Sequence, residues 1–89
     1  MYKAHANLGI LYSGKKNYAL ADEHFTTAID LGMRDAVLFR YAGYVCLLLN
    51  QYKRALKNYD TYLAQVPGDK NVRSLRERIY KAIVSTGHQ

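Results

Sequence analysis

The sequence predicts an all-α fold: an alpha-alpha superhelix of helix-turn-helix repeats with about five helices, forming a single domain over residues 1–89. Three observations support this prediction. A pattern of large, small and aromatic residues occurs twice, apolar residues return at helical spacing, and glycine or proline interrupts the chain between the helical segments. A fixed period of this kind is typical of stacked repeats, in which each unit buries its apolar face only against its neighbours.

The two copies of the pattern align position by position at an offset of 34 residues. The first is His5-x2-Leu8-Gly9-x2-Tyr12, Ala21-x3-Phe25 and Met33, and the second is Phe39-x2-Ala42-Gly43-x2-Cys46, Ala55-x3-Tyr59 and Pro67. This pattern resembles the tetratricopeptide repeat, with its signature W-x2-L-G-x2-Y…A-x3-F…P. The resemblance implies repeat 1 over residues 2–35, repeat 2 over 36–69 and a capping helix over 70–85. The chain departs from the signature where it lacks the family tryptophan, at Cys46 and at Met33.

The expected helices cover residues 3–14, 18–31, 35–48, 52–65 and 70–85. The first is expected to end at Gly14, because glycine accepts the left-handed conformation of a helix stop. Asp35 and Asp69 each follow a glycine or proline closely and are expected to cap the third and fifth helices.

Gly9 and Gly43 fall in the middle of expected helices, where glycine costs up to about 1 kcal/mol relative to alanine. We expect them there because the paired helix approaches closely, with Ala21 and Ala55 as the small residues opposite. The hairpin interiors are then expected to hold Leu8, Tyr12, Tyr18 and Phe25 in the first, and Phe39, Cys46, Tyr52 and Tyr59 in the second.

The two ends of the chain differ in pattern. The last helix carries an apolar stripe for docking on the preceding helix, made of Val72, Leu75, Ile79 and Ile83. Glu77 stands where the repeat would place its glycine, which predicts a capping helix with a solvated outer face. At the other end Tyr2, Ala4 and Leu11 form a partly apolar edge, which predicts either an upstream repeat or self-association through this edge.

Composition limits the class of protein. Eighty-nine residues make one small domain, and Cys46, the single cysteine, excludes an internal disulfide. The longest apolar run, 42–49, is far below the ~20 residues that span a bilayer, so no membrane insertion is expected. No secretory signal is visible, which favours a cytoplasmic location. The net charge of +6 favours acidic partners.

Motifs for catalysis or cofactor binding are weak. Gly9-x4-Gly14-Lys15 matches the start of a phosphate-binding loop, but Lys16 stands where serine or threonine should hold magnesium. The three histidines, His5, His24 and His88, lack the spacing of a helical metal site. His5 is read as a half-buried substitute for the family tryptophan and His24 as a residue of the polar face. We therefore expect no cofactor and no metal.

An enzyme is not expected either. Cys46 falls on a packing position, where a free cysteine behaves as a small hydrophobe. No activated nucleophile is visible, and the acids are placed on exposed helix faces: Asp22, Glu23, Asp30 and Asp60.

The resemblance implies a binding function, because the first helix of each tetratricopeptide repeat lines a concave groove that holds peptides or partner proteins. Projected onto this chain, the groove is lined by Lys3, Ala6, Asn7, Ile10, Ser13, Arg40, Tyr41, Tyr44, Leu47, Leu48, Ser74, Arg78 and Lys81. Tyrosine and arginine are the types that concentrate binding energy at interfaces. The expected ligand is a segment with apolar anchors and some negative charge.

Two branches of the family narrow this expectation. Members that grip the C-terminal carboxylate of heat-shock chaperones use cations, and the matching positions here hold none: Ala6, Ile10, Tyr41, Asn71 and Leu75. Secretion and pilus-assembly chaperones hold apolar segments of their clients, and a surface of Ile10, Tyr44 and Leu47 is compatible with that role.

A second function class stays open, namely binding of RNA or DNA. Five of the thirteen basic residues lie between positions 70 and 81, where Glu77 is the single acid. Arg73, Arg76, Arg78 and Lys81 could contact phosphates beside an exposed tyrosine. The simpler interpretation of this charge cluster is a solvated end cap. Most of the tyrosines are not expected to be free for stacking on bases, because core packing accounts for Tyr12, Tyr18, Tyr52, Tyr59 and Tyr80.

Overall fold

The computed structural model describes residues 1–86, and this part of the chain forms five α-helices. They are α1 (Tyr2–Gly14), α2 (Tyr18–Asp30), α3 (Ala36–Leu48), α4 (Tyr52–Gln65) and α5 (Lys70–Thr86). The all-α prediction is confirmed, and each expected boundary lies within one residue of the observed one. No helix in the described range is long and apolar enough to cross a membrane.

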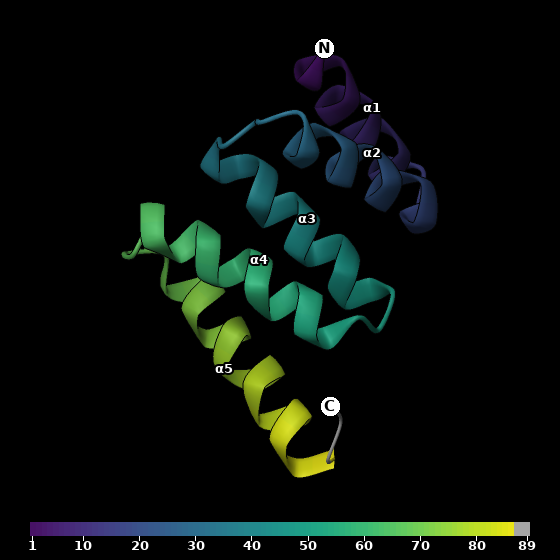
Figure 1. Ribbon diagram of the computed structural model, residues 1–89. Helices are drawn as coiled ribbons and strands as arrows, with labels where there is room; N and C mark the ends of the chain where they lie inside the picture. Colours follow the sequence, from purple (N-terminus) through teal and green to yellow (C-terminus); the bar gives the residue numbers. More distant parts are fainter. Residues whose placement is uncertain (87–89) are drawn as a thin grey trace.

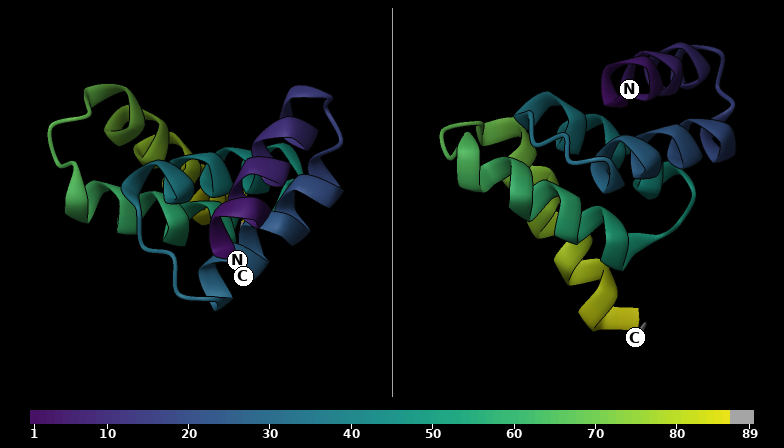
Figure 2. Two further views of the ribbon diagram at one scale, coloured as in Figure 1. Left: turned by 90° about the horizontal axis from the view of Figure 1, so that it is seen from above. Right: turned by 45° about the horizontal axis from the view of Figure 1, so that its top comes forward.

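The helices follow one another in a single row (Figure 1). Each helix packs against the next along the chain, and α1 also touches α3. The two ends of the described chain lie at opposite ends of the row (Figure 2, right). The helices are thus packed in sequential pairs, which agrees with a helical repeat arrangement.

The turns inside the two hairpins have the same geometry. Lys16 and Asn50, which occupy equivalent positions in the two copies, both adopt the left-handed conformation, with φ of 63° and 60°. The backbone N–H of the next residue donates to the carbonyl five residues earlier in both turns, at 2.9 Å in the first and 2.8 Å in the second. α1 therefore ends at Gly14 as expected, but the left-handed residue of the turn is Lys16 and not Gly14.

The two mid-helix glycines allow an aromatic ring to approach the backbone. A Cβ atom on Gly9 would lie 2.5 Å from the ring of Phe25, and one on Gly43 would lie 2.9 Å from the ring of Tyr59. Close approach of the paired helix is confirmed, although the nearest atoms belong to these rings and not to the expected alanines. Any larger residue would have to displace a ring that is itself buried.

Two apolar clusters form the core, and α3 contributes to both. Leu38, Ala42 and Val45 face the first cluster, with α1 and α2. Phe39 and Cys46 face the second, with α4 and α5. Because two faces of α3 are covered, this helix is the most completely buried element of the described chain.

The interior of the first hairpin differs from expectation. Leu8 is 37% exposed, while Ala6 is 6% exposed and takes a place in the core. Tyr12 and Tyr18 pack at the margin of the first cluster and are half-buried. The expectation for Leu8 was wrong because α1 is covered mainly by α2, so only one narrow face of α1 is buried.

Of the two expected helix caps, the one at Asp69 is observed and the one at Asp35 is not. Asp69 Oδ1 accepts a hydrogen bond from the Val72 backbone N–H at 3.1 Å, and its Oδ2 accepts one from the Tyr62 hydroxyl at 2.6 Å. These bonds, that of Tyr62 first, lower the pKa of Asp69, and the same bond raises the pKa of Tyr62. Asp35 occupies the N-cap of α3, but its side chain makes no capping hydrogen bond.

The apolar stripe of α5 docks as predicted. Val72 and Ile79 are buried in the second cluster, and Leu75 and Ile83 pack against it. At the other end of the row, Tyr2 and Leu11 are 39% and 50% exposed. The apolar edge of α1 is thus present, and self-association through it stays a prediction.

Candidate functional site

A groove opens between α3, α4 and α5. Its volume is about 310 Å³, and its lining comprises Arg40, Tyr41, Tyr44, Tyr59, Val72 and Leu75. The three α3 residues fall on one face because helical residues three and four apart are neighbours. The residues of α3 that enter the two core clusters lie on other faces of the helix, so Arg40 and Tyr44 remain exposed.

Tyr41 contacts both a core ring and a cation. Its ring stacks on Phe25, with the ring centroids 5.9 Å apart, and the Arg40 guanidinium carbon lies 5.3 Å from the Tyr41 centroid. The cation–π contact and the stacking on the buried Phe25 ring together restrict the orientation of Tyr41. Tyr44, one turn further along α3, is 47% exposed. The wall of the groove therefore carries one ordered tyrosine and one accessible tyrosine.

The base of the groove is apolar. Tyr59 is 2% exposed, and burial raises its pKa to about 12. Its hydroxyl therefore stays neutral at physiological pH. Val72 and Leu75 complete the base from α5. Among the described residues that line the groove, Arg40 alone carries a charge, and it also helps to lower the pKa of Asp69 near the start of α5.

The structure brings together three of the predicted groove residues, Arg40, Tyr41 and Tyr44. The other predicted residues do not line this cavity. Lys3, Asn7 and Ile10 are exposed on α1, Ser74 and Arg78 are exposed on α5, and Leu47 is half-buried against the second cluster.

The sequence reasoning missed Tyr59, Val72 and Leu75 as groove residues because it had assigned them to the core. All three do pack in the second cluster. A helical side chain can have one edge in the core and another edge in a groove, and spacing alone does not distinguish the two. The available signal was Gly43, because a mid-helix glycine marks a place where the paired helix brings a side chain close, here the ring of Tyr59.

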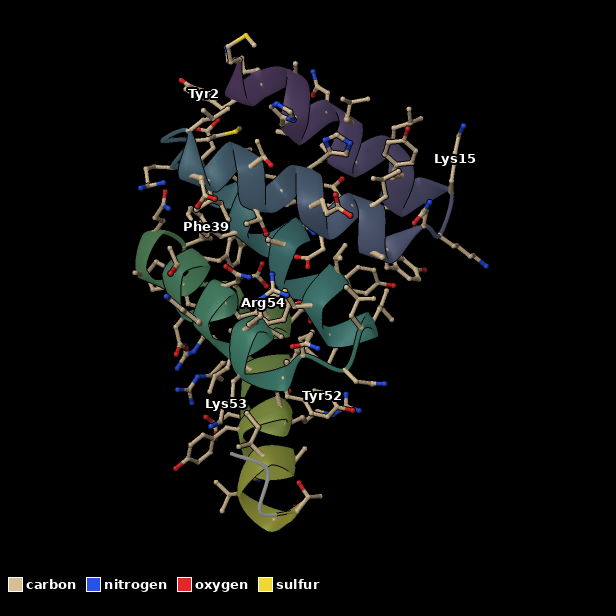
Figure 3. All side chains as sticks on the ribbon, turned by 45° about the vertical axis from the view of Figure 1, so that its right-hand side comes forward. Tyr2, Lys15, Phe39, Tyr52, Lys53 and Arg54 are labelled. Atoms are coloured by element: carbon tan, nitrogen blue, oxygen red, sulfur yellow. The ribbon has the colours of Figure 1, made fainter. Side chains whose placement is uncertain are left out.

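A polar network joins the two hairpins on another surface. Arg54 of α4 points toward α2 (Figure 3) and donates two hydrogen bonds to the carboxylate of Asp22, at 2.8 and 3.0 Å. The Cys46 sulfur lies 3.9 Å from Asp22 and 3.7 Å from the Asn58 amide nitrogen. Asp22 was expected on an exposed face, but its side chain is only 18% exposed because this contact covers it.

Cys46 offers no nucleophile in this network. Burial, above all other causes, raises the pKa of its thiol to about 11. The thiolate is the reactive form of cysteine, and it is disfavoured here. The described residues also contain no group of three or more His, Cys, Asp or Glu side chains that could together hold a metal ion.

The basic helix α5 is partly neutralised. Arg76 pairs with Asp60 of α4 at 2.8 Å and with Glu77 at 3.1 Å, and its guanidinium carbon lies 5.5 Å from the centroid of the Tyr80 ring. Tyr80 was expected in the core, but it is 47% exposed, because the core-facing positions of α5 are Val72 and Ile79. The exposed surface of α5 therefore presents fewer unpaired cations than the sequence count indicates.

Comparison with known proteins adds no identification to this geometry. No protein-family model matches the chain, and no curated protein matches it significantly. The fold and the groove thus rest on the chain's own residues.

Proposed function

We propose that this chain is a non-catalytic protein–protein interaction module of the tetratricopeptide-repeat type, acting as a scaffold or chaperone for another polypeptide. Its repeat character is supported by two features that recur at equivalent positions of both copies, the left-handed turn and the glycine beneath an aromatic ring. A non-catalytic role is supported by the protonated thiol of Cys46.

The observation that carries the proposal is the groove itself. Tyr44 is accessible beside a neutral, apolar base, and Arg40 stands at its margin as a cation. Tyrosine and arginine at the edge of an apolar pocket are frequent energetic centres of interfaces. The complementary ligand is a peptide segment with an apolar anchor for the base and a carboxylate within reach of Arg40.

A matched peptide panel tests this proposal. Peptides with two leucine anchors are titrated by fluorescence anisotropy, and they differ only in carrying glutamate, glutamine or lysine beside the anchors. We expect the glutamate peptide to bind most tightly. Tyr44→Ala should weaken its binding by at least about tenfold, the size of a modest interface hot spot. Arg40→Gln should abolish the difference between the glutamate and glutamine peptides.

Tyr80→Ala is the matched control, because Tyr80 is as exposed as Tyr44, at 47%, but lies outside the groove. Its affinity for the glutamate peptide should equal that of the unchanged protein. Equal losses in Tyr44→Ala and Tyr80→Ala, with circular dichroism unchanged in both, would contradict the groove as the binding site.

Nucleic-acid binding remains the second candidate, because the exposed ring of Tyr80 lies beside Arg76 and the cations Arg73, Arg78 and Lys81 are exposed. A single-stranded RNA or DNA 12-mer should then bind at low salt and lose affinity steeply as salt rises. Arg78→Gln with Lys81→Gln should reduce the salt slope by about two. Absence of binding at low ionic strength rules this candidate out.

A further inference from the structure

A histidine pair lies outside the groove, in the first hairpin. His5 of α1 and His24 of α2 come from different helices, yet a hydrogen bond of 3.2 Å joins their Nδ1 atoms, with one ring donating and the other accepting. Both side chains are half-buried. The expectation that His24 belongs to the polar face was therefore wrong, because the packing of α2 on α1 turns this residue into the contact between the two helices.

Aromatic stacking holds the pair in place. The ring of His24 stacks on Tyr12 with an interplanar angle of 5° and a centroid distance of 5.6 Å. The ring of His5 meets the Nδ1 edge of His24, with the ring centroids 5.4 Å apart and an interplanar angle of 28°. The stacking on Tyr12 and the hydrogen bond to His5 together restrict rotation of the His24 ring, so the two Nδ1 atoms stay close to each other.

The separation of the two nitrogens matches that of two ligands on one metal ion. With metal–nitrogen bonds of about 2.0–2.1 Å, two imidazole nitrogens on a tetrahedral ion lie about 3.3 Å apart, and neighbouring ligands of a square-planar ion lie about 2.9 Å apart. The observed 3.2 Å falls between these values. An ion that replaces the proton of this hydrogen bond can therefore be bound by both nitrogens after the two side chains rotate toward it.

We propose that His5 and His24 together bind a divalent transition-metal ion of the zinc, copper and nickel class through their Nδ1 atoms. Imidazole is a preferred ligand of these ions, whereas magnesium and calcium prefer oxygen. No third His, Cys, Asp or Glu side chain of the described range joins the pair. The remaining positions on the ion are open to water or to a ligand from another molecule.

A bound ion would cross-link α1 to α2 at a point remote from the groove, so this site is independent of the proposed peptide binding. Because the unfolded chain does not hold the two imidazoles together, binding favours the folded state and raises the melting temperature with ion concentration. The site thus gives the first hairpin a metal-dependent stability that the second hairpin lacks, since the equivalent positions of the second copy are Phe39 and Asn58.

The experiment is isothermal titration calorimetry with zinc, nickel and magnesium salts, combined with thermal unfolding. Zinc and nickel should bind with one ion per chain and raise the melting temperature, and magnesium should do neither. His5→Gln and His24→Gln should each weaken zinc binding by at least about tenfold. His88→Gln is the matched control, because the proposed site consists of His5 and His24 alone, and it should leave the affinity unchanged.

Histidine NMR resonances provide a second readout that does not depend on the stability of the variants. Addition of zinc to the unchanged protein should shift the signals of His5 and His24 and leave those of His88 in place. The proposal is overturned if both glutamine variants keep the zinc affinity of the unchanged protein, or if zinc shifts only the His88 signals.

Discussion

Leu38→Ala is expected to lower the free energy of unfolding by about 2–5 kcal/mol, the range for removing a large buried aliphatic side chain. Leu38 is 2% exposed and lies in the first core cluster, so truncation leaves a cavity that a rigid helix pair cannot fill by collapse. Urea denaturation followed by circular dichroism measures the difference between the variant and the unchanged protein.

Leu48→Ala on the same helix is the matched control. Leu48 is 40% exposed at the end of α3, so its truncation removes little buried area and should change stability by less than about 0.5 kcal/mol. The difference in stability between the two variants tests whether the side of α3 that carries Leu38 is buried. Similar losses in both variants would contradict the burial of Leu38 in the first core cluster.

Gly9→Ala is expected to destabilise the domain by about 1–3 kcal/mol, although alanine is the better helix former by about 1 kcal/mol. The new methyl group would lie 2.5 Å from a ring carbon of Phe25. Phe25 is 1% exposed, so its ring cannot move without displacing other core residues. The steric cost then exceeds the gain in helix propensity, and thermal or urea unfolding should show the loss.

Gly14→Ala separates these two effects. Gly14 is also helical, but a Cβ atom there would meet nothing within 4 Å. The substitution should therefore be neutral or stabilising by up to about 1 kcal/mol, from helix propensity alone. A Gly9→Ala variant that is as stable as Gly14→Ala would disprove the tight approach of α2 to α1.

Part of the groove could be predicted from the sequence. Arg40, Tyr41 and Tyr44 were identified because they share a face of one helix that the apolar repeat pattern does not use. The base of the groove was not identified, since Tyr59 and Leu75 belong to other helices and their apolar spacing marks them equally as core. Which edge of a packed side chain faces a groove depends on how neighbouring helices cross.

The ion pairs of the basic helix α5 could not be predicted from the sequence either. The sequence shows how many cations α5 carries, but the pairing of Arg76 with Asp60 joins residues on two helices and depends on their side-by-side packing. An ion pair of this kind neutralises a charge without changing the composition. The ion pair between Arg54 of α4 and Asp22 of α2 could not be predicted from the sequence pattern for the same reason.

The sequence by itself determined the number of helices, their bounds and the recurrence of the pattern, because helix formation depends on local hydrogen bonds and on an apolar stripe that spacing reveals. Only the tertiary structure decided that Phe25 covers Gly9, that His5 meets His24, and that the groove opens between α3, α4 and α5. These contacts depend on the angle and rotation of one helix against another, which side chains distant in sequence set together.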